Sequence, residues 1–146
     1  MSVIDTAMRV VHVLFAGAWA GGTLLFVGAV LPAARNGLLD ASALRAVTKR
    51  FGYLTTAAVV LLLLTGGHLA GTLYTFGSLQ STGRGHLVLS MVVLWFLLAG
   101  VAQFATKRLT DALATTDAKS AVDSTWTLFV LAAVLATGLL VVAGLL

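Results

Sequence analysis

Residues 85–106 read GHLVLSMVVLWFLLAGVAQFAT, a run of 22 residues without a charged side chain. A helix needs roughly 20 apolar residues to cross the hydrocarbon core of a bilayer, so this run is long enough to span it. Three further uncharged runs of at least this length occupy residues 10–34, 51–83 and 124–146. The sequence therefore predicts four transmembrane helices.

The composition supports a membrane location. Hydrophobic residues make up 60% of the 146-residue chain and charged residues only 10%, whereas a soluble domain is about one quarter charged. This balance excludes an ordinary soluble enzyme, a nucleic-acid-binding domain and a disordered segment, and it makes the lipid bilayer the main partner. The chain has no cysteine, which excludes disulfides, thiolate metal sites and iron–sulfur clusters.

Local signals set the expected ends of the helices. Ser2 followed three residues later by Asp5 resembles a capping box that starts the first helix. Pro32 is expected to end that helix, because the residue before a proline resists helical geometry. Residues 77–83 are rich in Gly and Ser and are expected to form a loop. The predicted fold is a single all-α domain, an antiparallel four-transmembrane-helix bundle with helices over about 3–32, 53–76, 85–107 and 123–146.

The basic residues predict which way the bundle points. Arg9 and Arg84 lie at one end of the predicted helices, and the other seven basic residues lie at the opposite end. Because basic loops are retained in the cytoplasm, both the N-terminus and the C-terminus are expected outside. The seven residues on the cytoplasmic side are Arg35, Arg45, Lys49, Arg50, Lys107, Arg108 and Lys119.

The three histidines are the main candidates for function, since an ionisable side chain inside a bilayer is costly and generally functional. His12 and His68 are expected at about the same depth, roughly 12–15 Å from the outer surface, and His86 opens the third helix on that side. Each lies on a polar stripe at helical spacing, so we expect one internal polar pocket that opens to the outside. The stripes are Asp5, Met8, Arg9, His12, Ala16, Trp19 and Thr23; Thr65, His68, Thr72 and Thr75; and His86, Ser90, Gly100 and Gln103.

A copper site is the first hypothesis for this pocket. Imidazole binds copper well, and thioether selects Cu(I). Met8 and His12 are four residues apart and are therefore neighbours on one helix. The proposed metal ligands are His12, His68, His86 and Met8. A set of this kind without thiolate is suited to binding copper moderately and releasing it.

A b-type haem is the second hypothesis. His12 and His68 on facing helices match the bis-imidazole ligation of membrane haem proteins. Arg9 and Arg84 would then pair with the haem propionates. The glycines beside His68, at residues 66, 67 and 71, either serve close helix packing or leave room for a flat ligand. Haem would imply electron transfer.

A structural role is the third hypothesis. Under this hypothesis the histidines only join helices, and the function belongs to a partner membrane subunit. The chain could also assemble with copies of itself as a homo-oligomer. An enzymatic role is less favoured, because the sequence has no paired carboxylates within a span, no catalytic triad and no phosphate-binding loop. A redox role follows only if haem is bound.

Five short stretches of the chain carry a family resemblance: RVVHVLFAGAWAGG at 9–22, LPA at 31–33, LTG at 64–66, GRGHLVL at 83–89 and KRL at 107–109. Together they resemble the copper resistance D (CopD) family. The resemblance implies copper uptake across the cytoplasmic (plasma) membrane of a prokaryote. Related four-helix membrane proteins with a histidine in the first helix bind haem, including the oxidase family that acts on protoporphyrinogen.

Overall fold

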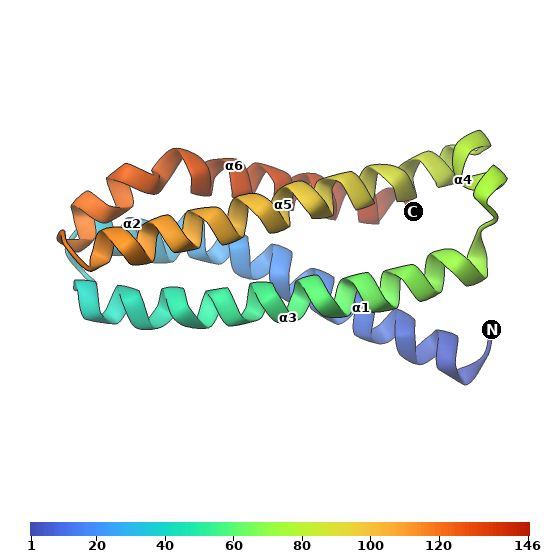
Figure 1. Ribbon diagram of the computed structural model, residues 1–146, viewed down its shortest axis with the longest axis horizontal. Helices are drawn as coiled ribbons and strands as arrows, with labels where there is room; N and C mark the ends of the chain where they lie inside the picture. The colour runs from blue at the N-terminus through green and yellow to red at the C-terminus, as the bar shows by residue number, and fades with distance from the viewer.

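The computed structural model describes all residues from 1 to 146 and is entirely helical (Figure 1). Four of its segments are long and apolar enough to cross a membrane, so the predicted all-α fold with four transmembrane helices is confirmed. The elements are α1 (Val3–Leu25), η1 (Phe26–Val30), α2 (Leu31–Arg35), α3 (Ala41–Leu73), α4 (Phe76–Ser81), α5 (Gly83–Leu113) and α6 (Ala118–Leu145).

The long helices pack side by side along one axis (Figure 1). The main neighbours are α1 with α3, α3 with α5, α5 with α6, and α6 with α1. This order closes a four-membered ring in which α1 and α5 are diagonal to one another. The N-terminus and α4 lie at one end of the bundle, and the α2–α3 and α5–α6 connections lie at the other.

The ends of the helices differ from the sequence-based expectation, because the helices continue beyond the apolar runs. A helix of 33 residues, as in α3, is about 50 Å long, whereas the hydrocarbon core is only about 30 Å thick. The predicted starts at 53 and 123 are therefore too late, and the predicted end at 107 is too early. Capping side chains set the true starts: Asp40 for α3, Thr82 for α5 and Asp117 for α6.

The first helix begins as predicted but does not end at Pro32. Ser2 and Asp5 form the full capping box, with each side chain accepting a hydrogen bond from the other residue's backbone N–H. Before the proline, five residues adopt π-helical geometry, and the Leu31 N–H bonds to the Phe26 carbonyl. A π turn widens the helix and relieves the clash that a proline ring makes with the preceding turn. The chain therefore stays helical through Pro32 to Arg35.

Residues 77–83 were predicted as a loop, and this was wrong for most of them. Thr75 caps a short helix, α4, through a reciprocal bond with Ser78. This helix packs against the first turn of α5, and the buried Gly85 is the point of contact. A Cβ at Gly85 would lie 2.5 Å from the Leu79 carbonyl oxygen and 2.6 Å from the Leu79 Cα. Only glycine allows this approach.

The buried core fills only the half of the bundle that is distant from the N-terminus. No residue of α1 before Trp19 is buried, and none of α3 beyond Thr65. In α6 no residue beyond Ala136 is buried. Aromatic rings lie at the centre of the packed half, where Phe26 stacks on Phe51 at 4.7 Å between centroids. The other end of the bundle is therefore more loosely packed.

We expect Gly85→Ala to release α4 from α5. The new methyl group would press on backbone atoms that have no room to move, and overpacking of this kind costs about 1–3 kcal/mol. Hydrogen exchange of residues 75–82 should become faster. Gly83→Ala is the matched control, because a Cβ at Gly83 meets nothing within 4 Å. Equal exchange rates in the two variants would contradict this account.

We also expect the cap of α6 to make stability depend on pH. The backbone N–H of Ser120 lies 2.7 Å from the Asp117 carboxylate, and this bond lowers the pKa of Asp117 from its ordinary value of 3.8. A lowered pKa means that the carboxylate stabilises the fold above about pH 4 and that this contribution is lost as the pH falls through the lowered pKa. Asp117→Ala should therefore lower the thermal midpoint at pH 7 but much less in strong acid. Asp117→Asn, which keeps the cap, should show little of this difference.

Candidate functional site

The polar residues singled out from the sequence lie at the loosely packed end of the bundle. Asp5 and His12 are in the first turns of α1, and His68 is in the last turns of α3, which runs antiparallel beside α1 (Figure 1). All three side chains are half-buried. On α1, Asp5 and His12 lie before Trp19, the first buried residue of that helix.

Hydrogen bonds between the two helices set their register. Asp5, His12 and Trp19 are seven residues apart, so they lie on one stripe of α1. Each bonds to α3: Asp5 to His68 at 2.9 Å, His12 to Thr65 at 2.9 Å and Trp19 to Thr55 at 3.2 Å. We call this set of three bonds the α1–α3 ladder.

The bond between His12 and Thr65 defines which ring nitrogen of His12 is free. The Thr65 hydroxyl has a single hydrogen, and it donates that hydrogen to the Leu61 carbonyl at 2.6 Å. Thr65 must therefore accept from His12, so the neutral His12 ring carries its proton on Nδ1. The Nε2 lone pair is left free. An imidazole held in this way by its second nitrogen is the usual arrangement of a histidine ligand.

His68 is oriented in the same manner by a carboxylate. Its Nε2 donates to Asp5 Oδ1, with 32% of the His68 side chain and 22% of the Asp5 side chain exposed. The other oxygen, Asp5 Oδ2, accepts from the Ser2 backbone N–H at 3.0 Å and from the Ser2 hydroxyl at 2.8 Å. The carboxylate thus accepts three hydrogen bonds, and His68 Nδ1 has no partner within the chain. Carboxylate–histidine pairs of this kind commonly support metal ligands.

Gly66 makes room for the His12 ring. A Cβ at Gly66 would lie 3.0 Å from His12 Cε1 and 3.5 Å from His12 Nδ1. A Cβ added at the adjacent Gly67 would meet no atom within 4 Å. Among the glycines near His68, Gly66 therefore allows α1 and α3 to pack closely, because the His12 ring of α1 lies against it.

The other sequence-predicted residues form no hydrogen bond with His12 or His68. Met8 is half-buried and lies between Asp5 and His12 on the same stripe of α1. Arg9 and Arg84 are exposed and form no ion pair. His86 is exposed, and its Nε2 bonds to the Gln80 carbonyl of α4 at 2.8 Å. No group of three or more His, Cys, Asp or Glu side chains is brought together anywhere in the chain.

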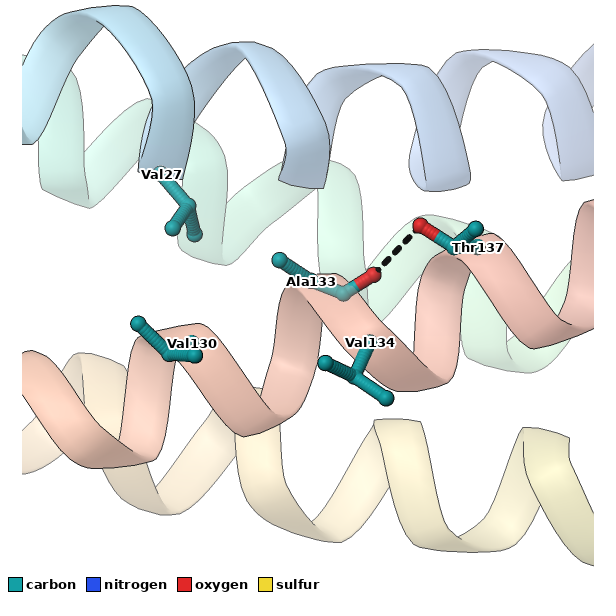
Figure 2. Close-up of a pocket in the computed structure, with 5 residues that line it drawn as sticks. All are labelled: Val27, Val130, Ala133, Val134 and Thr137. Atoms are coloured by element: carbon teal, nitrogen blue, oxygen red, sulfur yellow. Dashed lines mark hydrogen bonds between the residues drawn. The ribbon is translucent and has the colours of Figure 1, made fainter.

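Two hollows in the structure lie away from the histidines, and neither is the polar pocket expected from the sequence. One is a groove of about 280 Å³ between η1 and α6, lined by Val27, Val130, Ala133, Val134 and Thr137 (Figure 2). Its single hydroxyl, on Thr137, already donates to the Ala133 carbonyl at 2.9 Å, so the groove is an apolar surface. The other hollow, of about 480 Å³, lies between the α2–α3 and α5–α6 connections.

Sequence reasoning found the two histidines but not the partners that orient them. Asp5 was assigned to the cap of the first helix, and it does act there. Its second role, the bond to His68, depends on the register of α1 against α3. The signal was the seven-residue spacing of Asp5, His12 and Trp19, which places the carboxylate on the same stripe as the histidine.

Four long apolar helices packed into one bundle define this protein as a four-helix integral membrane protein. Residues 45–146 match the family model of Copper resistance protein D (CopD). This match covers well over half of the chain, so the chain belongs to the CopD family. It includes His68 and His86 but begins after α1, which carries Met8, Arg9 and His12. No curated protein and no solved structure matches the chain.

Gly66→Ala should displace the His12 ring and break its bond to Thr65, because a methyl group would stand 3.0 Å from His12 Cε1. Nitrogen-15 NMR of the imidazoles reports the tautomer directly. We expect a His12 signal with the proton on Nδ1 in the unmodified protein and a loss of this preference in the variant. Gly67→Ala adds the same methyl group in open space and should leave the signal unchanged. A wild-type His12 signal in Gly66→Ala would contradict the contact.

Proposed function

We propose that this protein binds copper at the loosely packed end of the bundle and takes part in moving it across the membrane. The observation that carries the proposal is the pair of oriented imidazoles on α1 and α3, each with one nitrogen bonded to a neighbour and one nitrogen free. Membership of the CopD family supports copper as the cargo. The membrane location follows from the four apolar helices.

In this proposal His12 Nε2 and His68 Nδ1 are the primary ligands, and the Met8 thioether is an auxiliary ligand. Cu(I) accepts nitrogen and thioether ligands at low coordination number, so it needs no third histidine or carboxylate. Asp5 acts through His68: it holds the ring and offsets the charge of the cation. Thr65 holds His12 in the same way.

His86 and the two arginines have outer roles in the proposal. His86 is bonded to α4 and lies on α5, which is diagonal to α1. We therefore assign it to an entry position and not to the primary site. Arg9 and Arg84 are exposed at the same end and are rim charges. Both termini are proposed to face the outside of a prokaryotic plasma membrane, because seven basic residues lie at the other end.

A haem bound by both His12 and His68 is less well supported by the packing. The His12 ring lies directly against Gly66 of α3, and three hydrogen bonds join the two helices. A macrocycle ligated by both rings would need α1 and α3 to separate. The haem hypothesis predicts a Soret band and is therefore tested by the same preparation.

The proposal is tested by Cu(I) binding to the purified protein in competition with a chromogenic chelator. His12→Ala and His68→Ala should each weaken binding by at least about tenfold, in line with the loss of a ligand or of its support. Met8→Leu should weaken it less. His86→Ala is the matched control, since it removes a histidine that is bonded elsewhere, and it should bind copper as the unmodified protein does.

Two results would contradict the proposal. Unchanged Cu(I) affinity in folded His12→Ala and His68→Ala proteins would leave the histidines with only the structural role of joining helices. A Soret band in the unmodified protein that disappears in both variants would assign the site to haem. The absorption spectrum of the preparation distinguishes these outcomes before any titration.

A further inference from the structure

A second group of polar residues lies on the exposed surface between α3 and α5, at the end of the bundle distant from the histidines. On α3 the spacing from Arg45 to Lys49, then to Gly52 and to Thr56, is four, three and four residues, which places these positions on one stripe facing α5. Three observations show that α3 and α5 meet along this stripe. Gln103 Nε2 donates to Thr56 Oγ1 at 3.2 Å, and Arg45 Nη2 donates to the Leu113 carbonyl at 2.8 Å. A Cβ at Gly52 would lie 3.6 Å from Thr106 Cγ2. We call Arg45, Lys49, Thr56, Gln103 and Lys107 the polar strip; all five are exposed.

The centre of the polar strip has hydrogen-bonding capacity that the protein does not use. The Thr56 hydroxyl donates to the Gly52 carbonyl at 3.0 Å and accepts from one N–H of Gln103. The carbonyl oxygen and the second N–H of the Gln103 amide have no partner in the chain. Such groups are costly on a membrane-embedded surface unless something else bonds to them. A ligand with both polar and apolar parts would meet this need.

The charge of the polar strip is positive. Lys107 pairs with Asp111 at 2.9 Å, but Lys49 has no carboxylate partner, and its Nζ lies 5.9 Å from the centre of the Tyr53 ring. Arg45 bonds only to a backbone carbonyl. Three cations therefore face one carboxylate across the strip. This arrangement favours an anionic ligand.

The residues change in chemical character along the membrane normal. Lys49 and Lys107 lie nearest the end of the bundle. Thr56 and Gln103 lie one to two helical turns closer to the middle of the membrane. Gly100 comes next, and a Cβ added there would meet no atom within 4 Å. A glycerophospholipid presents its groups in the same order: a phosphate, then ester carbonyls, then acyl chains. The geometry points to an anionic phospholipid bound in the polar strip, with its phosphate at Lys49 and Lys107, its ester region at Gln103 and a chain over Gly100. This inference is independent of the proposed copper site.

Native mass spectrometry of the detergent-solubilised protein tests it, with phosphatidylglycerol and phosphatidylcholine of identical chains as probes. The unmodified protein should retain phosphatidylglycerol preferentially. Lys49→Gln should weaken that retention about fivefold, which is the effect of one cation near an anionic lipid. Gln103→Leu should weaken the retention of both lipids. Lys119→Gln is the matched control, since it removes an exposed cation outside the strip, and it should change neither.

Three outcomes would overturn the inference. Equal retention of the two lipids by the unmodified protein would show that the strip does not select an anion. Equal loss in Lys49→Gln and Lys119→Gln would assign the preference to net charge. A dimer that disappears in Gln103→Leu, without selective lipid retention, would identify a second copy of the chain as the occupant. Arg45→Gln serves as a second strip variant if Lys49→Gln does not fold.

Discussion

The α1–α3 ladder is the set of interactions on which the rest of the structure depends. In hydrocarbon a polar side chain has no water to bond to, so it must find a partner on another helix. Trp19, His12 and Asp5 each find one on α3, and only one register of the two helices satisfies all three. A shift of either helix by one residue would leave an indole, an imidazole and a carboxylate without their partners.

The bundle has two halves that differ in packing. On one side of Trp19 the helices pack tightly around Phe26, Phe51 and Phe129. On the other side α1 has no buried residue, and two imidazoles are held there by hydrogen bonds. A rigid half anchors a looser half, which suits the proposed copper site, where an ion would have to bind and then leave.

The opposite end of the molecule is stabilised by a different kind of contact. Arg35 lies 2.6 Å from Asp123 and over the ring of Trp126. Helix caps at Asp40 and Asp117 start the two helices that enter the bundle there. These groups lie outside the apolar runs, where water and lipid headgroups replace hydrocarbon. The two ends therefore differ in chemistry as well as in packing, one with oriented histidines and the other with paired and unpaired cations.

The sequence by itself determined the four spans, the capping box at Ser2 and the polar stripes that carry the histidines, because these depend on local hydrophobicity and helical periodicity. Only the tertiary structure decided that Asp5 orients His68, that Thr65 orients His12 and that His86 bonds to α4. It also decided that α1 passes through Pro32 by a π turn and that α4 folds back on Gly85. The physical reason is that a stripe identifies the face of a helix, whereas the partner of each side chain depends on the register between helices, which arises only when they pack.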